Sequence, residues 1–148
     1  MGRRFGVYTI GYEDLTIDQF VRKLREHEIK TVVDVRLNAI SRRKGFSKSK
    51  LTEALNAVGI DYIHERDLGN PPENRESFRN GESEVGRRTM RARLDNGSRG
   101  AVERLVERAK NERVALLCVE ATDDRCHRQV VVEVALEVES DLYTTSIW

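Results

Sequence analysis

The stretch Arg99–Ala121, RGAVERLVERAKNERVALLCVEA, joins a helical pattern directly to a strand pattern. Apolar residues recur at helical spacing up to Arg113, which predicts an amphipathic helix. From Val114 the apolar residues become continuous, which predicts a buried strand. A second apolar helical pattern, HRQVVVEVALEVE, occupies His127–Glu139. A strand enclosed between two helices in this way is typical of α/β proteins with a parallel sheet.

The rest of the chain repeats this alternation. Thr16 and Gln19 form a capping-box pattern at the start of one helix, and Ser47 can cap another. Residues 70–98 contain both prolines of the chain and few apolar residues, which predicts short helices or a loop. We therefore expect a single α/β domain over residues 1–148, with a mostly parallel sheet flanked by helices on both faces and a loop-rich insertion around residues 70–98. The further strands are expected in FGVYTIGY (5–12), KTVVDVRLN (30–38), DYIHERDLG (61–69) and LYTTSIW (142–148).

The composition, with 39% hydrophobic and 34% charged residues, is that of a globular protein with a heavily charged surface. No apolar segment approaches the roughly 20 residues needed to cross a bilayer. The N-terminal MGRRFGVYTI lacks the pattern of a signal peptide. We therefore expect a cytoplasmic protein with no membrane partner, in which both cysteines are thiols.

Polar and titratable side chains follow the predicted strands. In open parallel sheets the carboxyl ends of the strands meet at one edge, where ligands bind. The sequence therefore predicts a site at this edge. The strand ends contribute Gly11, Tyr12, Asp34, Arg36, His64, Glu65, Cys118 and Glu120, and the helix start after the fourth strand adds Cys126, His127 and Arg128.

Cys126, His127 and Arg128 place a thiol, an imidazole and a guanidinium side by side. If an aspartate of the preceding DD pair caps the next helix, Cys126 lies in its first turn, where backbone N–H groups favour an anion. A thiol there ionises more easily, and its two neighbours act in the same direction. Cys126 is then a candidate nucleophile or anion-site thiol. The alternative is that Cys126 is a packed small residue and that Arg128 pairs with nearby acids.

The segment Ser41–Lys50, SRRKGFSKSK, is the most concentrated basic patch, with five basic and no acidic residues. Arg42, Arg43 and Lys44 could hold the phosphates of a substrate or of a nucleic acid. Arg outnumbers Lys 20 to 6 in the whole chain, so the patch can equally be a solvated surface loop.

Four other polar positions allow both a structural and a functional interpretation. Asp34 and Arg36 interrupt an apolar strand, so they either pair structurally or face the site. His64 is a candidate general base or a structural histidine at a strand end. Glu120 could orient an imidazole, bind a substrate hydroxyl or pair with Arg128.

No cofactor is expected. Cys118 lies inside an apolar run and fits a packed core position better than a reactive one. Cys118, Cys126 and His127 could bind zinc with His64 or Asp34 as the fourth ligand, although the spacing of the cysteines is not a standard zinc pattern.

The stretches YTIGYEDLTIDQFVRKLREHEIKTVVDVRLNAISRRKGFSKSKL, YIHERDLGNP and ALLCVEATDDRCHR resemble, in the same order, signatures of the domain-of-unknown-function 488 family. The resemblance spans about Tyr8 to Arg128. It implies an α/β domain with a pocket around the matched motifs, and it implies no particular reaction. The matched residues are Gly11, Tyr12, Asp34, Arg36, Ser41, Phe46, Leu68, Gly69, Cys118, Glu120, Cys126, His127 and Arg128.

The motif VVDVR and the strand-loop-helix around the thiols are also similar to the layout of rhodanese-type sulfurtransferases. In those enzymes the reactive cysteine begins a glycine-containing anion cradle. The segment CVEATDDRCHR has no glycine and two aspartates, which would repel an anion.

The function that these residues favour is an enzyme acting on a phosphate-bearing substrate, such as a nucleotide or a nucleic acid. Arg36 and Arg128 would hold the phosphate, since guanidinium groups bind phosphate in a bidentate way. His64 or Glu120 would act as acid or base, with Cys126 as nucleophile. The alternatives are a non-catalytic nucleic-acid-binding module, rhodanese-like sulfur transfer, and a small-molecule or metal sensor.

Overall fold

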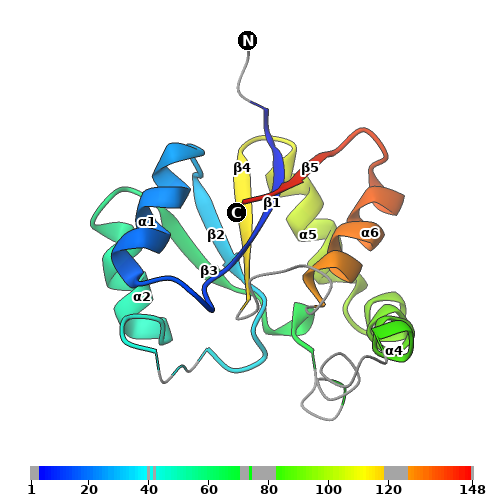
Figure 1. Ribbon diagram of the computed structural model, residues 1–148. Coiled ribbons are helices and arrows are strands. Elements are labelled where there is room, and N and C mark those ends of the chain that lie inside the picture. Colours follow the sequence, from blue (N-terminus) through cyan, green and yellow to red (C-terminus); the bar gives the residue numbers. More distant parts are fainter. Residues whose placement is uncertain are drawn as a thin grey trace.

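The computed structural model describes residues 4–39, 41, 43–70, 74, 83–118 and 127–147. Within these residues one parallel sheet has the strand order β3-β2-β4-β1-β5, which confirms the predicted α/β class (Figure 1). The strands are β1 (Gly6–Gly11), β2 (Thr31–Asp34), β3 (Asp61–His64), β4 (Arg113–Cys118) and β5 (Tyr143–Ser146). The helices are α1 (Ile17–Glu26), α2 (Lys48–Asn56), the 3-10 helix η1 (Arg66–Leu68), α4 (Ser83–Asn96), α5 (Arg99–Ala109) and α6 (Arg128–Val138).

Helices cover both faces of the sheet, as predicted (Figure 1). On one face, α1 and α2 bury Phe20 and Leu51 in a core that also contains Ile10 of β1. On the other face, α5 and α6 bury Leu105 and Val131 in a second core. Helix α4 packs against α5 and α6. The two cores leave the carboxyl edge of the sheet to the connecting loops.

Strand β4 is continuously apolar because it lies in the middle of the sheet. Val114 and Leu116 enter the core beneath α5 and α6, whereas Ala115 and Leu117 enter the core beneath α1 and α2. A strand buried on both faces has no solvent-facing positions, so it shows no polar alternation.

Of the two predicted N-cap side chains, one caps its helix and the other does not. The capping box of α1 is confirmed, because the Thr16 hydroxyl accepts from the Gln19 N–H at 3.1 Å and Gln19 Oε1 accepts from the Thr16 N–H at 2.9 Å. Ser47 is the N-cap residue of α2, but its side chain makes no capping bond. Its hydroxyl instead donates to the Ser41 carbonyl at 3.1 Å, so it closes the preceding loop.

The second half of the insertion is one long helix rather than short helices or a loop. Met90 and Leu94 of α4 are fully buried in the core that α5 and α6 share. On the flank of this apolar stripe, Arg87 and Arg91 pair with glutamates of α6. Few apolar residues suffice here because the helix buries only a narrow stripe and because arginine favours helix formation.

Helix α6 begins at Arg128, with His127 as its N-cap residue, within the helical pattern that the sequence predicts. The placement of Cys126 in the first turn, which depends on an aspartate capping this helix, stays a prediction. Cys126 itself, with Glu120 and both aspartates of the DD pair, lies outside the described residues.

Candidate functional site at the carboxyl edge

The strand register brings several predicted site residues to one edge. Gly11 at the end of β1 pairs with Cys118 at the end of β4, and Asp34 at the end of β2 pairs with His64 at the end of β3. Asp34 also lies opposite Leu117 of β4. The convergence of the strand ends is therefore as predicted, because every strand runs in the same direction.

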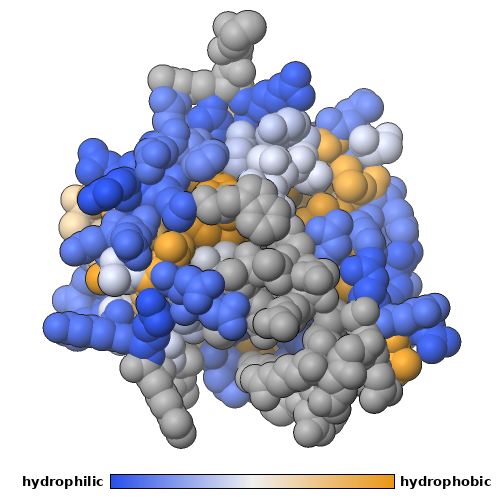
Figure 2. Space-filling view, viewed as in Figure 1, coloured by the Kyte–Doolittle hydropathy of each residue, from blue (hydrophilic) through white to orange (hydrophobic). Residues whose placement is uncertain are grey.

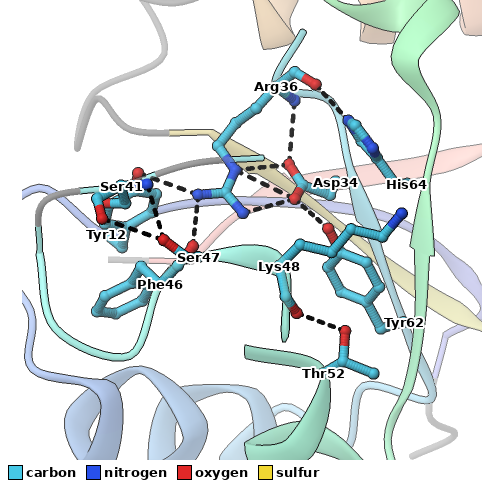
Figure 3. Close-up of polar contacts among 10 residues, drawn as sticks. All are labelled: Tyr12, Asp34, Arg36, Ser41, Phe46, Ser47, Lys48, Thr52, Tyr62 and His64. Atoms are coloured by element: carbon cyan, nitrogen blue, oxygen red, sulfur yellow. Dashed lines mark hydrogen bonds and ion pairs between the residues drawn. The ribbon is translucent and has the colours of Figure 1, made fainter. Parts of the chain in front are cut away.

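Asp34 and Arg36 form a buried ion pair at the centre of this edge (Figure 3). Arg36 Nε donates to both carboxylate oxygens, at 2.9 and 3.1 Å, and Nη2 donates to Oδ2 at 2.6 Å. The backbone N–H of Arg36 also donates to Asp34 Oδ1 at 3.0 Å, and this side-chain turn ends β2 at Asp34. The Asp34 side chain has no exposed surface and that of Arg36 is 2% exposed. Burial alone would lower the pKa of Arg36, but the hydrogen bonds and charge of Asp34 outweigh it and raise this pKa above its ordinary value.

Arg36 also ties down the loop that follows it. Its Nη1 donates to the Phe46 carbonyl at 2.6 Å and to the Tyr12 hydroxyl at 3.3 Å. The end of the loop 37–46 is thereby held by the side chain of the residue that precedes the loop. Ser41 and Ser47 add a second tie, because the Ser41 N–H donates to Ser47 Oγ at 3.0 Å. Arg36 is thus a tether, and the groups that it binds are protein groups.

Aromatic packing anchors the same loop to the core. The rings of Tyr12 and Phe46 are stacked, with centroids 4.2 Å apart and planes 9° from parallel. The ring of Phe20 in α1 meets Phe46 edge-on at 5.3 Å. Both Tyr12 and Phe46 are buried in the core, so their rings anchor the loop and present no face to a ligand.

Two imidazoles bind successive carbonyls of the chain after β2. His64 Nε2 lies 2.7 Å from the Arg36 carbonyl oxygen, and His127 Nε2 lies 3.0 Å from the Val35 carbonyl oxygen. A carbonyl only accepts, so Nε2 carries the proton in both rings. This fixes the tautomer and the orientation of each ring. The Nδ1 atom of His64 is then the nitrogen able to accept a proton.

Tyr62 is a site residue that the sequence analysis missed. It lies two residues before His64 on β3, and its hydroxyl donates to Asp34 Oδ2 at 2.5 Å. The signal was present as strand alternation, since residues i and i+2 of a strand point to the same face. Burial raises the pKa of Tyr62, and its hydrogen bond to Asp34 raises it further.

Tyr62 should ionise well after an ordinary tyrosine when the pH is raised. A folded-state pKa above the unfolded value of about 10 gives stability that is complete below pH 10 or so and lost as the pH rises through the folded pKa. Tyr62→Phe should therefore flatten the alkaline loss of stability and remove a late step from the near-ultraviolet tyrosinate titration. Tyr143→Phe, a change outside this network, is the control and should keep that step. Since burial also raises the pKa of Tyr8, a late step that keeps its full amplitude in Tyr62→Phe would contradict the assignment.

The basic patch lies on the tethered loop. Lys44 is exposed, and Arg43 is exposed although its Nε donates to the Leu15 carbonyl at 2.5 Å. Lys48 in the first turn of α2 extends on the Tyr62 and His64 side of the ion pair in Figure 3. Arg42 lies outside the described residues. Of the described cations of this patch, Arg43 and Lys44 are carried by the tethered loop, whereas Lys48 and Lys50 lie on α2.

The other predicted site residues that the structure describes lie at the start of α6 and at the end of β4. Arg128 is fully buried, at 0% exposure, at the start of α6, and His127 is 4% exposed. Cys118 ends β4. Within the described residues, no three His, Cys, Asp or Glu side chains are grouped closely enough to hold a metal ion. The thiol of Cys126 lies outside that search.

Three comparisons with known proteins bear on this site. The family model described as "Domain of unknown function DUF488" matches residues 16–135, a range that contains Asp34, Arg36, His64 and His127. Searches of curated proteins and of solved structures found no significant match. In the described part of the chain, no helix has the length and apolar character needed to span a membrane. Since the family model covers most of the chain, this protein belongs to the DUF488 family.

Proposed function

We propose that the carboxyl edge of the sheet is the active site of an enzyme that acts on a phosphate-bearing substrate, a nucleotide or a nucleic acid. The observation that carries the proposal is the tethered loop. This loop carries the exposed cations Arg43 and Lys44, and Lys48, just after it, extends on the side of His64, whose imidazole is oriented by the Arg36 carbonyl (Figure 3). A preorganised cationic loop favours anions without a large ordering cost on binding.

The roles follow from burial and exposure. Lys44 and Arg43, with Arg42, would contact the phosphate, because such contacts need side chains that reach solvent. Arg36 is 3% exposed and each of its guanidinium nitrogens donates to a protein group, so it would be a positioning residue for the loop. Asp34 holds Arg36 in that position. Gly11 and Tyr12 would shape the floor of the site from the end of β1.

His64 would exchange a proton with the substrate or with an attacking water through Nδ1. The bond from Nε2 to the Arg36 carbonyl supports this role, since an oriented imidazole is an effective acid or base near neutral pH. Cys126 remains a candidate nucleophile or anion-site thiol, and Glu120 a second candidate acid or base. His127 and Arg128 would position that segment from the start of α6.

The test uses two chromogenic probes, p-nitrophenyl phosphate for a monoester and bis-p-nitrophenyl phosphate for a diester. His64→Gln should lower kcat about 10²- to 10⁴-fold, the usual contribution of a general acid or base. Lys44→Gln should mainly raise KM. Arg25→Gln, an exposed change on α1, is the matched control and should leave both parameters unchanged. Full activity of His64→Gln would overturn the assigned role.

A non-catalytic nucleic-acid-binding module is the second candidate, and the exposed cations of the same loop favour it. Binding of a single-stranded oligonucleotide would then weaken steeply with salt and would not depend on His64. Turnover that requires His64 supports the enzyme, and salt-sensitive binding without turnover supports the module.

A further inference from the structure

A hollow of about 400 Å³ opens away from the carboxyl edge, beside the amino ends of β4 and β5. We call it the β5 hollow. Arg113 and Tyr143 begin these two strands, and His27 follows the last residue of α1. In Figure 2 the surface over β5 has intermediate hydropathy and lies beside strongly hydrophilic side chains. The lining residues are Arg4, Tyr8, His27, Arg113, Tyr143, Thr145 and Ser146.

The β5 hollow is positively charged. Among the described residues, its lining includes two guanidinium groups and an imidazole and no carboxylate. Arg4 is exposed, and its guanidinium lies 4.9 Å from the centre of the Tyr143 ring, on the ring face. A cation in this position is held near the hollow by the ring while its N–H groups stay available at the edge.

The second guanidinium is held rigidly. The Arg113 side chain is 9% exposed, its Nε donates to the Arg4 carbonyl at 3.1 Å and its Nη1 donates to the His27 carbonyl at 2.8 Å. Glu28 lies 3.3 Å from Nη1 and balances one positive charge without lining the hollow. The lining therefore keeps an excess of positive charge even after this ion pair is counted.

Hydroxyl groups and aromatic rings complete the lining. The rings of Tyr8 and Tyr143 meet edge-on with centroids 5.8 Å apart, and the Tyr8 hydroxyl donates to the Arg4 carbonyl at 3.0 Å. Thr145, two residues after Tyr143 on β5, adds a hydroxyl that can donate to an anion. The hollow thus combines charge-assisted donors with an apolar ring surface.

We propose that the β5 hollow binds a small phosphate monoester. The phosphate would lie between Arg4, Arg113 and Thr145, because these lining side chains carry the guanidinium and hydroxyl donors that phosphate oxygens accept from. The organic group would lie against the rings of Tyr8 and Tyr143. The volume supports an ester rather than a bare ion, since it falls within the range of about 300–1,000 Å³ that is usual for small-molecule sites. This site is separate from the carboxyl edge and does not depend on the function proposed there.

The test is titration of the isotope-labelled protein with phenylphosphonate, a phosphate-monoester mimic that resists hydrolysis, followed through backbone amide shifts. The amides of Tyr143–Ser146 and Arg4 should shift together. Arg4→Gln should weaken binding about tenfold, the effect of losing one charge-assisted contact. Arg25→Gln is the control of equal charge change and should bind as tightly as the wild type. Since Arg4 is exposed, its replacement should not prevent folding.

The following results would contradict the proposal or one part of it. If shifts appear only around Asp34 and His64, or if Arg4→Gln binds as tightly as the wild type, the β5 hollow is not the site. If benzoate binds as tightly as phenylphosphonate, the preference for phosphate is wrong. If inorganic phosphate binds as tightly, the rings of Tyr8 and Tyr143 contribute nothing and the ester assignment is wrong.

Discussion

Asp34→Ala should lower the free energy of unfolding by about 3–5 kcal/mol, the cost of leaving one partner of a buried ion pair uncompensated. Arg36 would keep its bonds to Phe46 and Tyr12 but lose the carboxylate that neutralises it, at a place with almost no exposure to water. Urea denaturation of the wild type and the variant measures the difference.

Two further variants separate the ion pair from a general effect of mutation. Asp61→Ala removes an exposed ion pair, with Lys30 at 3.5 Å and both side chains more than half exposed, and should cost less than about 1 kcal/mol. The double variant Asp34→Ala/Arg36→Met should be less destabilised than the sum of the two single variants, since it leaves no unpaired charge. A cost for Asp34→Ala as small as that for Asp61→Ala would show that the pair does not organise the loop.

Gly69→Ala should have the second largest effect, because it forces apart the segments that follow β2 and β3. A Cβ atom at position 69 would lie 2.7 Å from Leu37 Cα and 2.8 Å from Leu37 N. These are backbone atoms, so the contact cannot be relieved by a rotamer change. We expect a loss of about 2–3 kcal/mol from overpacking and, for the proposed enzyme, a lower kcat because His64 shifts relative to the loop.

Gly97→Ala is the matched control, since a Cβ atom there would have no heavy atom within 4 Å. Thermal or urea unfolding of both variants checks the prediction. Equal stability of the two variants would mean that the Leu37 segment can move away freely, and the rigid connection between the two strand ends would then be wrong.

The order of helices and strands could be predicted from the sequence because each element carries its own pattern. The capping box at Thr16 and the continuous apolar run of β4 are examples in which one local rule was sufficient. The convergence of Asp34 and His64 also followed, since parallel strands that end in polar residues bring them to one edge. Helix α4 was missed as a long helix because Met90 and Leu94, which anchor it in the core, form only a narrow apolar stripe among charged residues.

The role of Arg36 could not be predicted. The sequence left open whether it pairs with other protein groups or binds a ligand, and the answer depends on the Phe46 carbonyl, which reaches the guanidinium only when the loop is closed. Tyr62 could not be connected to Asp34 before the pairing register of β2 and β3 was known. Such contacts between residues distant in the sequence leave no periodic pattern in it.

The strand order also determines when this chain can fold during synthesis. β1 is made early, yet its partners in the sheet are β4, where Gly6 pairs with Arg113, and β5, where Gly6 pairs with Tyr143. A chain emerging from a ribosome can pair β2 with β3 early, but β1 has to wait for strands made much later. Such long-range pairing slows folding and leaves apolar surface open in the meantime. The apolar side chains of β1 therefore stay without their neighbours in the sheet until the second half of the chain is made.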